Sequence, residues 1–248
     1  MNPNKATSYR EVGLAFELRK FVRPVHFAEG EGLPWGFGTA IIVQYKSDFF
    51  IVTARHVLEN QQAKVEDFRV RLDGENIAIP VCSFSKVKVS DGSSLSSPED
   101  LDVIIFEVDQ RLYKSISLQP LISYCTEESV CSSYFIPDGA ELLVAGYPEI
   151  ENRYDYESEK INDPLAFKVG TKSVLGMGDP MYMFSGEPFN KTYNGMSGAP
   201  VFWIEDGVLK VTGMVLMGTA SSGILHYVDF RVVFSAVAKV WLKLQACN

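Results

Sequence analysis

Residues 38–54 read GTAIIVQYKSDFFIVTA, two apolar runs on either side of the polar segment Lys46-Ser47-Asp48. Val, Ile, Thr and Phe favour extended backbone, and a short polar segment between two such runs is typical of a β-hairpin. We therefore expect antiparallel strands at residues 38–43 and 49–53. Similar short runs, separated by Gly, Pro, Asn, Asp and Ser, recur along the chain, and they predict strands at residues 68–72, 76–81, 103–108, 141–145, 199–204, 209–216 and 224–228.

Helical periodicity is clear at the end of the chain only. One face of a helix over residues 232–248 would carry Val232, Val233, Ala236, Val237, Val240, Trp241 and Leu244. The stretches 89–100 and 149–163 are polar and predict long surface loops. The sequence therefore predicts an all-β body with a C-terminal α-helix.

Composition narrows the classes of function. The 248 residues carry a formal net charge of -8, and no cluster of Lys and Arg suggests a nucleic-acid partner. The first residues lack the pattern of a secretory signal, and no apolar run is as long as a membrane span. We therefore expect a cytoplasmic protein that binds neither nucleic acid nor membrane.

The four cysteines, Cys82, Cys125, Cys131 and Cys247, lack the spacing of a zinc site. In a cytoplasmic chain they are expected to be reduced thiols. Cys125 and Cys131 are near enough in sequence to form a disulfide, and the sequence leaves that question open.

The strongest local motif is Asn194-Gly195-Met196-Ser197-Gly198-Ala199-Pro200, a serine between glycines just before an apolar strand. Glycine lets the backbone turn tightly, so the amides of Gly195 and Ser197 can point together at an oxyanion. The alternative is an ordinary Gly-Ser turn between two strands, which is common in β proteins.

His56 and a pair of acids complete a catalytic pattern. His56 directly follows the apolar run 49–53, where an imidazole can be held rigidly as the base that activates a serine. Asp100 and Asp102 precede the predicted strand 103–108, where a carboxylate can orient that imidazole. Strand register favours Asp102, with Asp100 as the rival. Taken singly, the histidine could be a structural polar contact and the aspartates could be loop ends.

In the order His, Asp, Ser, these motifs resemble the trypsin-like (chymotrypsin-fold) serine peptidases, most closely their bacterial HtrA-like branch. Residues 53–57 are similar to the motif T-A-x-H, residues 102–106 to D-[IL]-A-[LV]-[LI], and residues 195–200 to G-[DN]-S-G-G-P. The resemblance extends from about residue 36 to residue 234. It implies a serine endopeptidase that cleaves peptide bonds through an acyl-enzyme and needs no cofactor or metal.

The resemblance also implies an architecture of two packed antiparallel six-stranded β-barrels with the active site between them. The corresponding domains are an N-terminal arm at residues 1–14, a barrel at 15–120, a second barrel at 121–231 and a helix at 232–248. By the same likeness the catalytic residues are His56, Asp102 and Ser197, and the oxyanion hole is formed by Gly195 and Ser197. The implied substrate-binding residues are Leu216, Met217, Gly218, Gly223 and Lys191, and Lys191 at the pocket base would favour an acidic side chain.

Two departures from the family pattern matter. Met196 replaces the acid that pairs with a newly cleaved N-terminus in secreted relatives, so activation by clipping is not expected. No PDZ domain is expected after the peptidase region. Two other readings stay open: a catalytically idle double barrel that binds proteins, and a peptidase that needs a partner protein to order its pocket loops.

Overall fold

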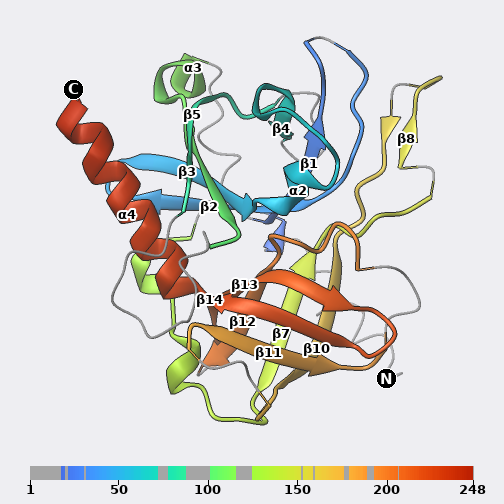
Figure 1. Ribbon diagram of the computed structural model, residues 1–248, viewed down its shortest axis with the longest axis vertical. Helices are drawn as coiled ribbons and strands as arrows, with labels where there is room; N and C mark the ends of the chain where they lie inside the picture. Colours follow the sequence, from blue (N-terminus) through green and yellow to red (C-terminus); the bar gives the residue numbers. More distant parts are fainter. Residues whose placement is uncertain are drawn as a thin grey trace, which may run out of the picture.

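The computed structural model describes residues 18–19, 22–30, 32–71, 78–87, 101–115, 125–151, 153–158, 160–175, 179–188, 193–205 and 207–247. Strands predominate, and they form two β-structures with a long helix that runs beside both (Figure 1). In this part of the chain, no helix combines the length and the apolar character needed to cross a membrane.

The first β-structure is a six-stranded antiparallel sheet from the N-terminal half, in the order β4-β1-β2-β3-β6-β5. Its strands are β1 (Val22–Phe27), β2 (Thr39–Tyr45), β3 (Asp48–Ala54), β4 (Phe68–Val70), β5 (Val81–Lys86) and β6 (Val103–Val108). β2 and β3 form the predicted hairpin, with Tyr45 opposite Asp48. Their apolar residues are buried because both faces of these central strands are covered.

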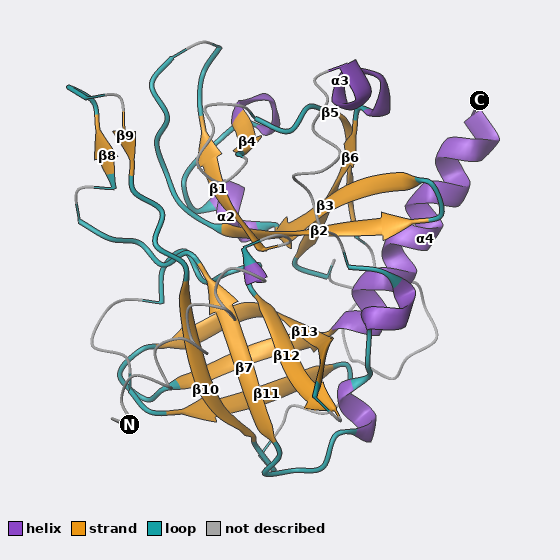
Figure 2. Ribbon diagram, turned by 180° about the vertical axis from the view of Figure 1, so that it is seen from behind, coloured by secondary structure: helices purple, strands orange, loops and turns teal. Residues whose placement is uncertain are grey.

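The second β-structure is a closed antiparallel barrel, in the order β10-β11-β14-β13-β12-β7 (Figure 2). Its strands are β7 (Glu141–Gly146), β10 (Ala166–Lys172), β11 (Met181–Gly186), β12 (Pro200–Glu205), β13 (Val208–Thr219) and β14 (Ile224–Asp229). Because the barrel is closed, its strands are hydrogen-bonded to a neighbour on both sides along most of their length. The all-β body and one of the two predicted six-stranded barrels are thus confirmed, whereas the described part of the N-terminal half is an open, curled sheet in place of the other barrel.

The sequence did not predict three of the strands, β1 in the sheet and β10 and β11 in the barrel. β1 reads VRPVHF and is buried along its whole length although it contains Arg23, Pro24 and His26. β10 carries Lys168 and Lys172, and β11 lacks a run of β-branched residues. The formation of these strands depends on tertiary pairing with distant strands, which a local pattern does not report. The predicted strand 76–81 is also displaced, since β5 begins at Val81.

The polar segment 149–163 contains a small hairpin, where the sequence predicted a loop only. Its strands are β8 (Tyr154–Asp155) and β9 (Lys160–Ile161), with Tyr154 opposite Ile161. The hairpin projects beside β1 and the segment that follows it (Figure 1). The other predicted loop, 89–100, lies outside the described residues.

The C-terminal helix α4 (Phe230–Cys247) begins two residues before its predicted start. The buried carboxylate of Asp229 accepts a hydrogen bond from the N–H of Arg231 at 2.8 Å, which fixes this start. α4 packs on β13, β14 and β2. At its far end, Trp241 Nε1 donates to Asp48 Oδ2 at 2.7 Å, so the helix ties the sheet to the barrel.

Three cysteines in the described part, Cys82, Cys125 and Cys131, are free thiols. Burial raises the pKa of Cys125 to about 12 and that of Cys82 to about 11, so neither thiol is ionised near neutral pH. The predicted reduced state is confirmed for these three, and Cys125 and Cys131 do not pair.

A buried polar cluster fastens the β8–β9 hairpin to β1. The imidazole of His26 is fully buried, with Nε2 2.9 Å from Asp163 Oδ2 and Nδ1 2.8 Å from the hydroxyl of Tyr154. Arg153 Nε donates to Asp163 Oδ1 at 2.7 Å. Burial lowers the pKa of His26 from its ordinary value of 6.5, and the nearby carboxylate of Asp163 opposes this effect without overcoming it.

This cluster predicts a pH dependence of stability. Between the lowered pKa of folded His26 and about 6.5, the unfolded chain binds more protons than the folded chain, so the free energy of unfolding falls as the pH is lowered. The contribution is complete above about pH 6.5. Urea unfolding near neutral pH and about one to two pH units lower should show this fall in the wild type and in His226→Gln, and a smaller fall in His26→Gln. An equal fall in all three proteins would contradict the role of His26.

Candidate active site

Strand pairing brings the predicted base and acid together. β3 and β6 are antiparallel neighbours, with Ala54 opposite Val103. His56 therefore follows the end of one strand, and Asp102 precedes the start of its neighbour. The N–H of Arg55 donates to the backbone carbonyl of Asp102 at 3.2 Å, which closes this corner of the sheet.

Asp102 holds His56 with both carboxylate oxygens. Oδ1 accepts the backbone N–H of His56 at 3.0 Å, and Oδ2 forms a short hydrogen bond with the ring nitrogen Nδ1. Two contacts from one carboxylate fix both the position of the imidazole and the nitrogen that carries its proton. Asp100, the rival acid, lies outside the described residues.

Ser197 reaches the same imidazole from the barrel. Its Oγ lies 2.7 Å from His56 Nε2, on the ring nitrogen opposite the one that Asp102 holds. Three residues far apart in sequence thus form one continuous hydrogen-bonded series, from carboxylate to imidazole to hydroxyl. In that arrangement His56 can accept the proton of Ser197 and make its oxygen nucleophilic.

The backbone around Ser197 requires glycine at two positions. Gly195 has φ +84° and Gly198 has φ +87°, both in the left-handed region. A Cβ at Gly195 would lie 2.9 Å from the backbone nitrogen of Glu149, and one at Gly198 would lie 2.5 Å from Thr53 Oγ1. The glycines of the motif are therefore needed to bring this loop against both the barrel and the sheet.

The backbone N–H groups of Gly195 and Ser197 were predicted to form an oxyanion hole. Within the described ranges, neither N–H donates a hydrogen bond to another group. Both residues also line the cleft described below. Both amides therefore remain able to donate to an oxyanion there.

A buried threonine in the sheet fixes the position of the loop around Ser197, and no local sequence pattern indicated this role. Thr39, the first residue of β2, donates its hydroxyl to the carbonyl of Gly195 at 2.6 Å, and its N–H donates to the carbonyl of Ser197 at 3.1 Å. Its hydroxyl also accepts the N–H of Tyr147 at 2.9 Å. The hydroxyl of Thr53, three residues before His56, donates to the carbonyl of Thr39 at 2.6 Å. Thr39 therefore links the loop at residues 194–199, here called the serine loop, to strand β3, which leads to His56.

Two further contacts fix the serine loop on the barrel side. Asn194 Nδ2 donates to Glu149 Oε2 at 2.9 Å, and the N–H of Glu149 donates to the carbonyl of Asn194 at 2.7 Å. Met196 is buried in the barrel core beside Tyr193 and Ala199. An apolar side chain therefore anchors the serine loop in the barrel core at this position.

A cleft of about 720 Å³ lies over these groups. Among its lining residues are all three members of the hydrogen-bonded series, together with the predicted substrate-binding residues Leu216, Met217 and Gly218. Gly223 is not part of the lining. It lies in the turn between β13 and β14, where its carbonyl accepts the N–H of Gly186 at 3.0 Å. Lys191 lies outside the described residues.

The cleft has lining residues that the sequence did not indicate, among them Phe37, Gln61, Tyr193 and Leu225. Gln61 connects two walls: its Nε2 donates to the carbonyls of Phe37 at 2.7 Å and Val57 at 2.8 Å. A glutamine in a polar stretch gives no local signal of such a role, because it depends on a loop that is distant in sequence.

No protein-family model matches the chain, and a search of curated proteins found no match either.

Proposed function

We propose that the chain is a serine endopeptidase of the trypsin-like type. The observation that carries the proposal is the series Asp102–His56–Ser197, in which each contact lies at hydrogen-bond distance and the hydroxyl faces a cleft. A structural polar contact would explain any one of these pairs. It does not explain why all three residues meet in the order that nucleophilic catalysis requires.

The geometry supports the following reaction. Ser197 Oγ attacks the carbonyl carbon of a peptide bond while His56 Nε2 takes the hydroxyl proton, and Asp102 stabilises the resulting imidazolium. The amides of Gly195 and Ser197 stabilise the oxyanion. His56 then gives its proton to the departing amine, which leaves an acyl-serine. A water molecule, deprotonated by His56, attacks that ester and releases the acid and the free serine.

An exposed strand edge supports a peptide as the substrate. Met217, Gly218 and Thr219 of β13 pair with β14 on one side. On the other side, β12 begins only at Pro200, opposite Met214, so no described strand pairs with residues 217–219 there. This edge lies in the cleft, where an extended peptide can add to it through backbone hydrogen bonds.

The rest of the proposal follows from the same likeness. The open six-stranded sheet corresponds to the first barrel of a chymotrypsin-like fold, and the closed barrel corresponds to the second. The domains keep the boundaries expected above, and the protein acts in the cytoplasm on protein or peptide substrates without a cofactor. A partner protein that orders the pocket loops would control the activity.

An unfolded protein substrate tests the activity. The purified chain is incubated with a reduced and alkylated protein, and new N-termini are identified by mass spectrometry, with Ser197→Ala as the matched control. We expect cleavage by the wild type and none by the variant. Equal cleavage by both proteins would overturn the proposal, and cleavage by neither would favour the idle double barrel or a peptidase that requires its partner protein.

Thr39→Val should lower kcat and leave KM nearly unchanged. The substitution keeps the shape of the side chain but removes the hydroxyl that pairs with the Gly195 carbonyl and the Tyr147 N–H. The serine loop would then no longer be held in the position that places Ser197 against His56. A buried unmatched polar group costs about 1–3 kcal/mol, which corresponds to a loss of about 10- to 100-fold if it falls on the transition state. Thr39→Ser, which retains the hydroxyl, should recover most of kcat. Equal activity of the Val and Ser variants would contradict the positioning role.

A further inference from the structure

A second cavity, of about 390 Å³, lies away from the cleft. It lies between the β8–β9 hairpin, the segment around Pro34, and strands β1 and β4. Its lining combines apolar residues such as Leu33, Pro34 and Ile161 with the rings of Tyr154 and Tyr156. The volume suits a small organic molecule, at the lower end of the range for ligand pockets.

Positive charge gathers at this cavity although the chain as a whole carries -8. Arg69, Arg71 and Lys160 line it, against the single carboxylate of Asp155. That carboxylate already accepts hydrogen bonds within its own turn, from Ser158 Oγ at 2.5 Å and from the N–H groups of Glu157 and Ser158 at 3.2 Å. It is the one carboxylate among the described lining residues, so the lining carries more positive than negative charge.

Two of these cations have no acidic partner in the described part of the chain. Arg69 Nη1 donates to the neutral carbonyls of Glu66 at 2.6 Å and Phe68 at 2.9 Å, and neither Arg69 nor Lys160 lies within 4.0 Å of a described carboxylate. Burial lowers the pKa of Arg71, and Asp163 and Tyr154 oppose that effect without overcoming it. An anion in the cavity would supply a countercharge for Arg69 and Lys160.

The walls of the cavity are held in place. The hydroxyl of Tyr154 forms a short hydrogen bond with the carbonyl of Gly36 and contacts the buried His26. The hydroxyl of Tyr156 donates to the carbonyl of Pro34 at 3.2 Å. The two rings are nearly parallel, with an interplanar angle of 8°. The hairpin is thus docked on the sheet, and the space between them is built before any ligand arrives.

We propose that this cavity binds a small organic anion, a compact apolar or aromatic body that carries a carboxylate or phosphate group. Arg69 and Arg71 would pair with the anionic group, because a guanidinium presents two parallel donors to such oxygens. The apolar body would contact Leu33, Pro34 and Ile161, and Lys160 would add positive charge at the rim. This inference does not depend on the proposed peptidase activity.

Binding can be measured by calorimetry on the full chain with four probes. Phenyl phosphate and benzoate combine a ring with an anion, inorganic phosphate lacks the ring, and phenol lacks the charge. We expect saturable binding of phenyl phosphate or benzoate that is at least about tenfold tighter than that of inorganic phosphate or phenol. Whichever of phenyl phosphate and benzoate binds more tightly indicates whether the cavity prefers a phosphate or a carboxylate group. Absence of saturable binding of both at millimolar concentration would overturn the proposal.

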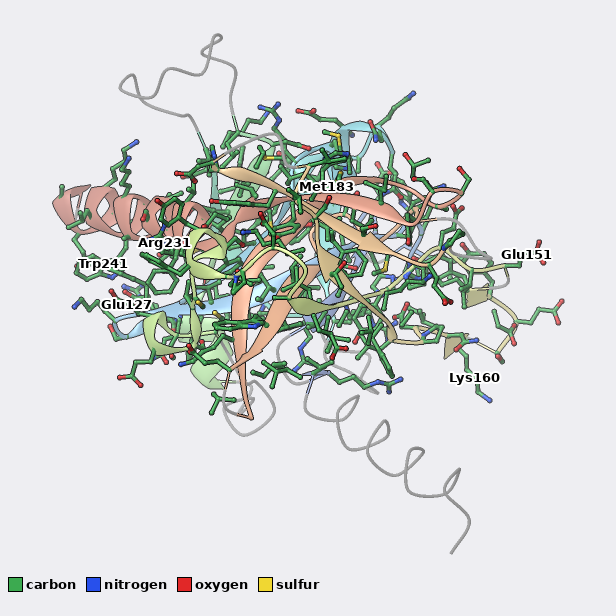
Figure 3. The ribbon with its side chains drawn as sticks, turned by 90° about the horizontal axis from the view of Figure 1, so that it is seen from below. Glu127, Glu151, Lys160, Met183, Arg231 and Trp241 are labelled. Carbon is green, nitrogen blue, oxygen red and sulfur yellow. The ribbon has the colours of Figure 1, made fainter. Side chains whose placement is uncertain are left out.

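Substitutions of the two arginines test whether the probe binds in this cavity. Arg71→Gln and Arg69→Gln should each weaken binding by about tenfold, the effect of losing one charged hydrogen-bonding partner. Lys239→Gln removes the same charge from α4, at the opposite end of the molecule from Lys160 (Figure 3), and should leave binding unchanged. Thermal unfolding of each variant confirms that it is folded.

Methyl NMR gives an independent location. The probe should shift the methyl signals of Leu33 and Ile161 and leave that of Met217, in the cleft, unchanged. Shifts confined to Met217, or binding unaffected by both arginine substitutions, would overturn the proposal. Because none of these readouts measures hydrolysis, a failed peptidase assay and a failed binding assay remain separate results.

Discussion

Asp102→Asn should lower kcat by about four orders of magnitude while the protein stays folded. Asparagine has the same shape as aspartate but only one acceptor oxygen, whereas Asp102 accepts from both the backbone N–H and Nδ1 of His56. The amide NH₂ group would then face the ring and favour the imidazole tautomer with its proton on Nε2. That nitrogen could no longer accept the proton of Ser197.

The measurement for this substitution is kcat on a peptide that the wild type cleaves, together with thermal unfolding. Asp109→Asn is the matched control, because Asp109 follows the opposite end of β6 and accepts from the N–H groups of Arg111 and Leu112, which lie away from His56 in the sequence. The control should keep nearly full activity. If Asp102→Asn kept it as well, Asp102 would not be the acid, and Asp100 would become the candidate.

His56→Gln should have a still larger effect, a loss of about a millionfold, as should Ser197→Ala. Of the residues that the structure describes, His56 is the one that hydrogen-bonds with both Ser197 and Asp102, so its removal leaves the hydroxyl without a base. The double variant should be no worse than either single variant, because the two residues act as one unit.

The double variant separates catalysis from general damage to the fold. Losses that multiply in the double variant would indicate two independent contributions and would contradict a shared proton transfer. His226→Gln is the control for loss of an imidazole elsewhere, since His226 lies within β14 and does not line the cleft. It should retain full activity.

The hairpin could be predicted because it depends on a short local pattern, and the meeting of His56, Asp102 and Ser197 could be predicted because three short motifs occur in the order that resembles the trypsin-like peptidases. An apolar run ends shortly before His56, another begins directly after Asp102, and glycines lie close on both sides of Ser197. Antiparallel pairing of β3 and β6 then places the first two residues side by side. Turn chemistry accounts for Gly195 and Gly198, whose positive φ values match the tight turn that the motif suggests.

The supports of the site could not be predicted, because they are tertiary contacts between distant segments. Thr39 looks like an ordinary strand residue, yet it holds a loop more than 150 residues away through hydrogen bonds to Gly195 and Ser197. Glu149 and Asn194, whose positions differ by 45 in the sequence, also pair. Strand β1 escaped prediction for a related reason: His26 is polar in sequence but fully buried against Tyr154 and Asp163.

The most direct test of the central claim is labelling with a fluorophosphonate, which reacts with a serine only when a neighbouring base activates it. The purified wild-type protein, Ser197→Ala and His56→Gln are incubated with the probe, and the modified residue is identified by mass spectrometry. We predict stoichiometric labelling of the wild type at Ser197 and no labelling of either variant. Labelling that persists in Ser197→Ala, or a wild-type protein that does not react, would contradict the assignment of an active triad.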